Sequence, residues 1–159
     1  MFTLTCISYA EGAVIPVAYA HRTVAGGKNI SPHFRWEDPP PRTKSFALSI
    51  IDPHPVADNW VHWFVIDIPF RDREIREGAS GTGRMPAGSK ELLNSYNEKG
   101  YGGPAPPKGS GSHPYVATLY ALNVPSLPLA RDTVRSAFLR ALEGKVIAEA
   151  VMTGYHERT

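Results

Sequence analysis

Residues 45–51 read Ser-Phe-Ala-Leu-Ser-Ile-Ile, and the apolar Phe46, Leu48 and Ile50 alternate there with smaller side chains. This period of two is typical of a β-strand, because successive side chains of a strand point to opposite faces. The run stops at Asp52, directly before a proline. We therefore predict a strand over residues 45–51.

A second segment, residues 60–68, reads Trp-Val-His-Trp-Phe-Val-Ile-Asp-Ile. Its aromatic and β-branched side chains fall on both faces, which favours a central strand that is covered on both sides. Strict alternation along this strand would place His62 on the same face as Trp60, Phe64 and Ile66.

Two more segments have the character of strands. Residues 115–122 form an apolar run with Pro114 ahead of it and Pro125 after it, which predicts a third strand. Residues 145–153 alternate again, so we predict a final strand there.

One short helix is expected over residues 131–143, where apolar side chains recur at helical spacing. Asp132 can cap its start, and Gly144 follows as a C-terminal stop. The chain holds 14 glycines and 15 prolines, which leave little room for long helices. The composition therefore excludes helix bundles and coiled coils.

Between residues 71 and 111 the chain is rich in Gly, Pro, Ser and Asn and shows no strand or helix periodicity, apart from a short turn expected at residues 90–93. A segment of ~40 residues without periodicity is too long for an idle connection, so we expect it to be functional. The chain shows no internal repeat and no shift in composition. A single domain over residues 1–159 is therefore predicted.

Charge and cysteine content narrow the possible partners and locations. The formal net charge is +2 and the charges are spread along the chain, so nucleic acid is not an expected partner. Cys6 is the only cysteine, which is consistent with a reducing compartment and predicts a cytoplasmic location. No targeting segment is recognised, and the apolar runs fall short of the ~20 residues that span a bilayer.

Polar residues gather where the predicted strands end or begin. If the three strands are neighbours, Asp52, His62, His113 and Tyr115 converge on one patch. Histidine and tyrosine donate hydrogen bonds, and the turn at residues 109–111, Gly-Ser-Gly, can present backbone amides to an anion. Phosphate or carboxylate is the expected ligand of such a patch. Asp52 would hold a histidine in its charged form or accept a hydrogen bond from an ammonium group, so a zwitterionic headgroup would satisfy both signs.

Other interpretations of the same residues stay open. His62 is flanked by two tryptophans and could be structural, and an aspartate before proline, as at Asp52, commonly forms a turn. A serine hydrolase is the main catalytic alternative. The chain has no Gly-x-Ser-x-Gly motif, so the nucleophile would have to be Ser110 or Ser112.

A metal-dependent hydrolase is a further alternative, because aspartate and histidine suit zinc. The spacing of the candidate ligands matches no known metal motif. These ligands would be Asp52, His54, His62 and His113. The chain has no P-loop and no dinucleotide fingerprint, so no nucleotide cofactor is expected.

Several motifs occur together in chain order and cover nearly the whole sequence. They are Asn29-Ile30-Ser31-Pro32, Asp52-Pro53, Trp60-Val61-His62-Trp63, and Gly103-Pro104-Ala105-Pro106-Pro107 with Gly109, His113 and Tyr115. In these motifs the chain resembles the phosphatidylethanolamine-binding protein family, also called Raf kinase inhibitor-like proteins, in its small bacterial and archaeal form.

The resemblance implies a mainly β fold, a sandwich of two antiparallel sheets with a short C-terminal helix, and an anion pocket at one end. By motif position, the pocket residues would be Asp52, His62, Gly103, Ala105, Pro106, Pro107, His113 and Tyr115. Family members bind phosphate-bearing or carboxylate ligands, some inhibit kinases or proteases, and small prokaryotic members are often homodimers. The resemblance requires neither catalysis nor a cofactor.

Two positions depart from the family pattern. His54 stands where the family usually has an acidic residue, and residues 93–96, Leu-Asn-Ser-Tyr, replace a Gly-Asn-Asp-Phe pattern. His54 would either favour anions in the pocket or point outward.

We expect a binding module rather than an enzyme, in which His62 and His113 donate hydrogen bonds to phosphate and at least one of them is protonated near Asp52. The affinity would then fall as the pH rises. A partner-binding role of the loop at 71–111, toward a protease or a kinase, is a separate hypothesis.

Overall fold

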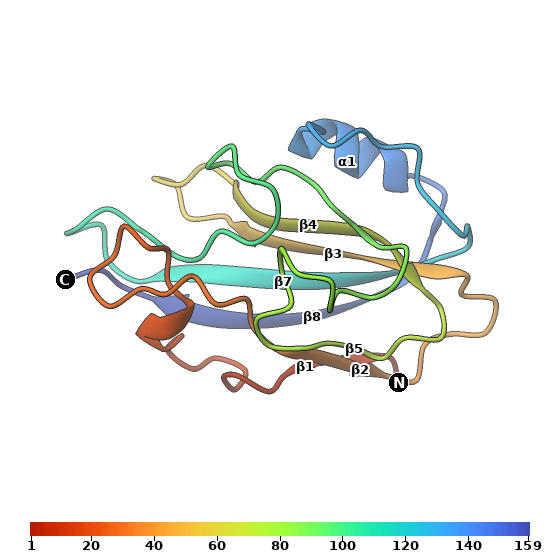
Figure 1. Cartoon of the computed structure of the whole chain (residues 1–159), viewed down its shortest axis with the longest axis horizontal. Helices are drawn as coiled ribbons and strands as arrows, with labels where there is room; N and C mark the ends of the chain where they lie inside the picture. The colour runs from red at the N-terminus through yellow and green to blue at the C-terminus, as the bar shows by residue number, and fades with distance from the viewer.

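A computed structural model describes residues 1–159 and is built on a five-stranded antiparallel sheet with the order β6-β4-β3-β7-β8 (Figure 1). Its strands are β3 (Ser45–Asp52), β4 (Trp60–Pro69), β6 (Lys90–Glu91), β7 (His113–Leu122) and β8 (Val146–His156). All four strands predicted from the sequence are present. The central strand is β3 rather than β4, because β4 has only the two-residue β6 on its other side. Both faces of β4 are nevertheless covered.

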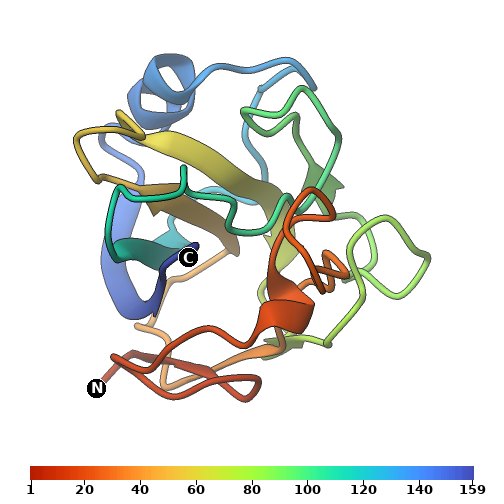
Figure 2. The same cartoon turned by 90° about the vertical axis from the view of Figure 1, so that its left-hand side faces the viewer.

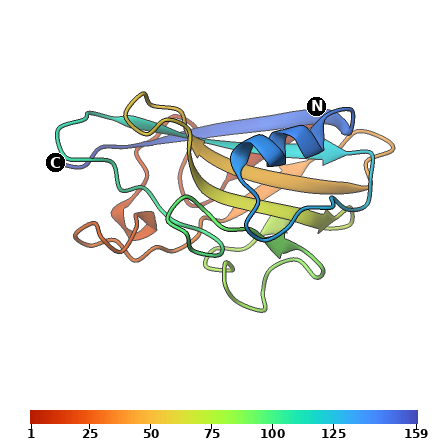
Figure 3. The same cartoon turned by 90° about the horizontal axis from the view of Figure 1, so that it is seen from above.

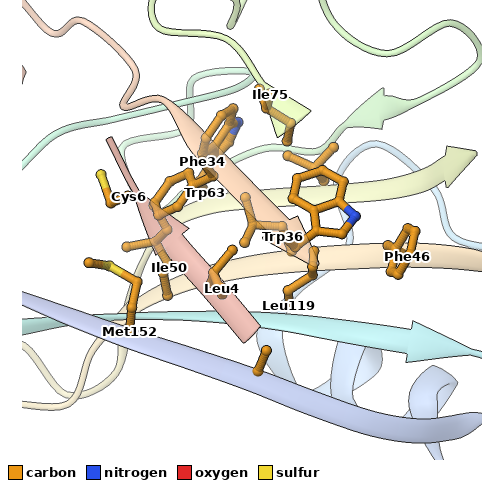
Figure 4. Close-up of a cluster of buried hydrophobic side chains, with 14 of the residues drawn as sticks. Leu4, Cys6, Phe34, Trp36, Phe46, Ile50, Trp63, Ile75, Leu119 and Met152 are labelled. Atoms are coloured by element: carbon orange, nitrogen blue, oxygen red, sulfur yellow. The ribbon is translucent and has the colours of Figure 1, made fainter. Parts of the chain in front are cut away.

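A second, three-stranded antiparallel sheet has the order β1-β2-β5 and packs on one face of the large sheet. Its strands are β1 (Thr3–Cys6), β2 (Phe34–Glu37) and β5 (Glu74–Ile75). Trp36 from this sheet and Phe46 and Trp63 from the large sheet are buried together in the main core (Figure 4). The mainly β fold with two antiparallel sheets and one short helix is thus confirmed.

The other face of the large sheet is covered by α1 (Arg135–Leu142), as the end-on view in Figure 2 and the view from above in Figure 3 show. The Phe138 ring stacks on Phe64 of β4 with a centroid separation of 4.1 Å. No helix of the structure has the length and apolar character to cross a membrane.

The predicted helix over 131–143 begins too early. Residues 131–134 are turn and extended backbone, Val134 occupies the N-cap position, and no side chain caps the helix, so the predicted cap at Asp132 is wrong. Gly144 lies just beyond the helix with a φ of 73°, a left-handed conformation that suits glycine at a helix end.

A β-bulge at the start of β4 changes the orientation of His62. Val61 and Trp63 pair with consecutive residues of β3, so His62 is the extra residue between them. Phe64 and Ile66 belong to the buried cluster beneath α1, whereas Trp63 belongs to the main core. The prediction that His62 shares a face with Phe64 and Ile66 is therefore wrong, because alternation fails at a bulge.

The irregular segment at 71–111 connects the two sheets. It supplies β5 to the small sheet and β6 to the large one, so residues 90–91 form a strand where the sequence predicted a turn. The carboxylate of Glu91 in β6 accepts hydrogen bonds from Trp63 Nε1 at 2.9 Å and from the backbone N–H of Gly81 at 2.9 Å. This segment is therefore held to the core of the protein before it reaches the site.

Candidate functional site

A cavity of about 350 Å³ lies at the end of the molecule that faces the viewer in Figure 2. Here β3 ends, and its antiparallel neighbours β4 and β7 begin, with Asp52 directly opposite Trp60. Seven of the eight predicted site residues line this cavity: Asp52, His62, Ala105, Pro106, Pro107, His113 and Tyr115. The expected convergence of the three strands therefore occurs, while the ligand-binding role of these residues stays a prediction.

Asp52 and His113 form a buried pair at the strand ends. Both side chains are almost inaccessible, and Asp52 Oδ2 accepts a hydrogen bond from His113 Nδ1 at 2.6 Å. His113 Nε2 lies 2.8 Å from Ser110 Oγ, and the Ser110 hydroxyl donates to the Pro107 carbonyl at 2.6 Å. Since a serine hydroxyl has one proton to donate, Ser110 Oγ accepts from His113 Nε2–H. Both ring nitrogens of His113 are therefore engaged within the protein.

His54 lies against this pair but does not line the cavity. Its ring stacks on His113 with centroids 3.8 Å apart, and its backbone N–H donates to Asp52 Oδ1 at 2.9 Å. His54 Nδ1 accepts a hydrogen bond from the Val56 backbone N–H at 3.1 Å. His54 therefore shapes the turn after β3, whose Val56 and Ala57 form one wall of the cavity.

His62 is buried, and its tautomer is determined by a hydrogen bond to one backbone carbonyl group. Its Nδ1–H donates to the Gly102 carbonyl at 2.7 Å, and the Gly102 N–H donates to the His62 carbonyl at 2.9 Å. Burial lowers the pKa of His62 from 6.5 to about 4, against the opposing effects of the Gly102 hydrogen bond and the Asp52 charge. The ring is therefore neutral at pH 7, and Nε2 carries a lone pair.

This geometry corrects the hypothesis that His62 and His113 both donate to a bound phosphate. His62 has no proton on the nitrogen left for the cavity, and both ring nitrogens of His113 are engaged by Asp52 and Ser110. The part of the hypothesis that places a protonated histidine next to Asp52 stays a prediction.

Tyr115 offers the donor that these histidines do not. Its hydroxyl is buried and has no hydrogen-bond partner within the protein, although the side chain lines the cavity. Burial, with a smaller effect of the Asp52 charge, raises the pKa of Tyr115. The phenol therefore stays protonated and can donate to a ligand oxygen.

Gly103 is the one predicted site residue that does not line the cavity. A Cβ atom there would lie 2.1 Å from the Tyr19 carbonyl oxygen, so only glycine allows this close approach. The Gly103 N–H donates to Asn29 Oδ1 at 2.7 Å, and the next residue's carbonyl accepts from His21 N–H at 3.0 Å. Gly103 thus anchors the segment whose following residues, 105–107, form the cavity wall.

Sequence reasoning missed six lining residues, which are Thr23, Val56, Ala57, Trp60, Tyr96 and Arg158. Arg158 supplies a guanidinium, with Nη2 donating to the Thr23 carbonyl at 3.1 Å. The antiparallel pairing of predicted strands 115–122 and 145–153 was a usable signal, because it places the residues after β8 beside the start of β7. Tyr96, in contrast, comes from the irregular segment and gave no periodic signal.

Trp60 and Tyr96 form an aromatic wall. Their rings meet edge to face with centroids 5.3 Å apart, and Tyr96 also stacks on His21 at 4.1 Å. The Tyr96 hydroxyl donates to the Gly103 carbonyl at 2.7 Å. This wall combines apolar surface with ring faces that can attract a cation.

The four side chains considered for a metal site do not assemble into one. No group of three or more His, Cys, Asp or Glu side chains is placed to hold a metal ion. Asp52 is instead bonded to His113, His62 Nδ1 to a carbonyl, and His54 Nδ1 to a backbone N–H.

Sequence similarity to known proteins gives evidence of family membership that does not depend on the site geometry. A family model described as phosphatidylethanolamine-binding protein matches residues 6–157. The chain is 38% identical over 151 residues to a UPF0098 protein of Aquifex aeolicus, covering 95% of this chain and 85% of that protein.

Two solved structures extend the comparison. The crystal structure of Escherichia coli YbcL, described as a new member of the mammalian PEBP family, has a TM-score of 0.93 and 28% identity, with 99% of each chain covered. A carboxypeptidase Y inhibitor in complex with its cognate proteinase has the same fold, with a TM-score of 0.59 and 20% identity over 99% of this chain and 83% of that one.

Proposed function

The chain belongs to the phosphatidylethanolamine-binding protein family, and from this premise we propose that it is a non-catalytic binding module for a small oxyanion. The ligand is a phosphate group, a phospholipid headgroup or a carboxylate, bound in the cavity at the junction of β3, β4 and β7. The observation that carries this proposal is the buried, unpartnered hydroxyl of Tyr115 in a cavity that Arg158 also lines.

The polarity of the cavity supports an anion as the ligand. An unpaired buried hydroxyl costs free energy, and a ligand oxygen that accepts from Tyr115 removes this cost. Arg158 can present further N–H donors and a positive charge, because only its Nη2 atom has a hydrogen-bond partner.

A zwitterionic headgroup would use the remaining surfaces. An ammonium group could lie against the aromatic wall of Trp60 and Tyr96 or near the Asp52 carboxylate, while the phosphate faces Tyr115 and Arg158. The Asp52–His113 pair has little net charge in its ionised form, so it would not repel the anion strongly.

We expect the Arg158→Ala variant to bind inorganic phosphate about tenfold more weakly than the wild type, because a charge-assisted hydrogen bond is lost. Isothermal titration calorimetry at pH 7 measures this affinity. Arg131→Ala is the matched control, since Arg131 is exposed and lies outside this cavity. Equal affinities of the Arg158→Ala variant and the wild type would show that the guanidinium does not contact the anion.

Regulation of a protease or a kinase is the second part of the proposal. Its support is the fold that the chain shares with an inhibitor crystallised on its proteinase. The homodimer, the cytoplasmic location and the single-domain organisation stay predictions.

A serine hydrolase is the alternative that one observation favours. Asp52, His113 and Ser110 form a continuous chain of contacts in the order of a catalytic triad, at 2.6 and 2.8 Å. Catalysis would require the Ser110 hydroxyl to turn from the Pro107 carbonyl toward His113. This candidate predicts that a fluorophosphonate adds to Ser110 but not to Ser112, as seen by peptide mass spectrometry. Protein that stays unlabelled contradicts it.

A further inference from the structure

The cavity offers hydrogen-bond donors and one hydrogen-bond acceptor, the Nε2 atom of His62. His62 Nδ1–H is committed to the Gly102 carbonyl, and Nε2 has no hydrogen-bond partner within the protein. The His62 side chain lines the cavity. The lone pair of Nε2 is therefore available to a ligand.

The groups around His62 keep it in this state. Burial has the largest effect on the pKa of His62 and, with the His21 charge, opposes protonation of the ring. The backbone hydrogen bonds with Gly102 and Gly103 and the charge of Asp52 at the end of β3 favour protonation. Tyr96 and Tyr115 meet the ring edge to face with centroids 5.9 and 4.9 Å away. None of these neighbours donates a hydrogen bond to Nε2, so the donor must come from the ligand.

A ligand that satisfies the whole cavity must therefore accept and donate. It accepts from the Tyr115 hydroxyl and from Arg158, and it donates a proton to His62 Nε2. An oxyanion with an O–H group meets both demands in one small group. A fully deprotonated oxyanion would place an oxygen lone pair against the lone pair of Nε2.

We propose that the cavity selects oxyanions that carry a proton, namely hydrogen phosphate and phosphate monoesters, over oxyanions of equal charge that carry none, such as sulfate esters and phosphodiesters. This selectivity rests on the proposed function and identifies His62 as the residue that determines it. Among the ligands proposed above it favours the phosphate group over the phosphodiester of a phospholipid headgroup and over a carboxylate.

The ionisation of phosphate monoesters makes this selection effective near neutral pH. Their second pKa is about 6, so roughly half of a monoester carries a P–OH group at pH 6. Sulfate esters and phosphodiesters have no such proton and would have to protonate His62 on binding. The pKa of about 4 makes that protonation unfavourable at pH 6.

The test uses methyl phosphate, methyl sulfate and dimethyl phosphate, titrated calorimetrically into the wild-type protein at pH 6. The methyl phosphate monoanion has the same charge as the other two anions and differs from methyl sulfate chiefly in its proton. We expect methyl phosphate to bind at least about tenfold more tightly than either, because the others leave a buried acceptor unpaired. Its affinity should fall by about fivefold from pH 6 to 7 and by about tenfold from pH 7 to 8.

Two variants separate His62 from a general effect on the site. In His62→Gln the side-chain amide can donate or accept, so the ratio of methyl phosphate to methyl sulfate affinity should collapse to within about threefold. In Tyr115→Phe both affinities should fall while their ratio is retained, because the phenol donates to either anion. Circular dichroism confirms that each variant is folded.

The outcomes distinguish this inference from the proposed function. If methyl phosphate and methyl sulfate bind the wild type equally well, or if the ratio persists in His62→Gln, the selectivity inference is overturned and the anion site stands. If dimethyl phosphate binds as tightly as methyl phosphate, a lipid-type phosphodiester is accepted and the inference is again wrong. If none of the three anions binds, the proposed function fails for phosphate and for phospholipid headgroups.

Discussion

The Asp52→Ala variant is expected to lose about 3–5 kcal/mol of its free energy of unfolding at pH 7. Asp52 is 2% exposed and His113 is fully buried, so the substitution leaves a buried histidine without its carboxylate partner. It also removes the acceptor of the His54 backbone N–H. Urea denaturation followed by tryptophan fluorescence measures the loss.

Two variants control for this effect. Asp52→Asn keeps an acceptor oxygen for the His54 N–H and places an NH2 group where Oδ2 now accepts from His113. A neutral His113 can accept from that group through Nδ1, so the loss should be smaller than for Asp52→Ala. Ser110→Ala removes the contact at the other end of His113, where Ser110 is partly exposed, and should cost about 1 kcal/mol. An Asp52→Ala protein within about 1 kcal/mol of the wild type would show that the pair is not a stabilising feature.

Acid should destabilise the protein through His62. Its pKa is about 4 in the folded state and about 6.5 in the unfolded chain, so below pH 6.5 the unfolded chain binds a proton that the folded one does not. The stabilisation is complete above pH 6.5 and is lost as the pH falls toward 4. This amounts to about 2 kcal/mol between pH 7 and 5, and on the order of 3 kcal/mol by pH 4.

The measurement is the free energy of unfolding from pH 7 to 5 in the wild type and in His62→Gln. The variant has no titratable group at this position, so its free energy of unfolding should fall less steeply, and the difference between the two curves isolates His62. The range stops at pH 5 to limit protonation of carboxylates. Parallel curves for the two proteins would mean that His62 titrates normally in the folded state.

Side-chain periodicity located the long strands because each has a face of apolar residues against the main core. β1 and β2 were not predicted from periodicity, because a strand of four residues contains too few alternations to be recognised. β5 and β6 have two residues each and exist only because longer strands pair with them. The second sheet was therefore predicted only through the resemblance to a family.

The candidate site was predictable where it depends on strand ends. Asp52, His62, His113 and Tyr115 meet because three neighbouring strands start or stop at one edge. The state of His62 was not predictable, because its tautomer depends on a carbonyl 40 residues away. A bulge and a loop contact decide whether this histidine donates or accepts, and neither has a periodic signature.

Binding of an oxyanion in this cavity is tested by titrating the ¹⁵N- and ¹³C-labelled wild-type protein with inorganic phosphate and following the NMR signals. We expect saturable shifts with one binding constant, largest at Tyr115, His62 and Arg158. Signals of Lys90 and Lys99, two lysines beside a different cavity, should shift little. Saturable shifts centred on those lysines, or no saturable shift at Tyr115, would contradict the claim that this cavity binds an oxyanion.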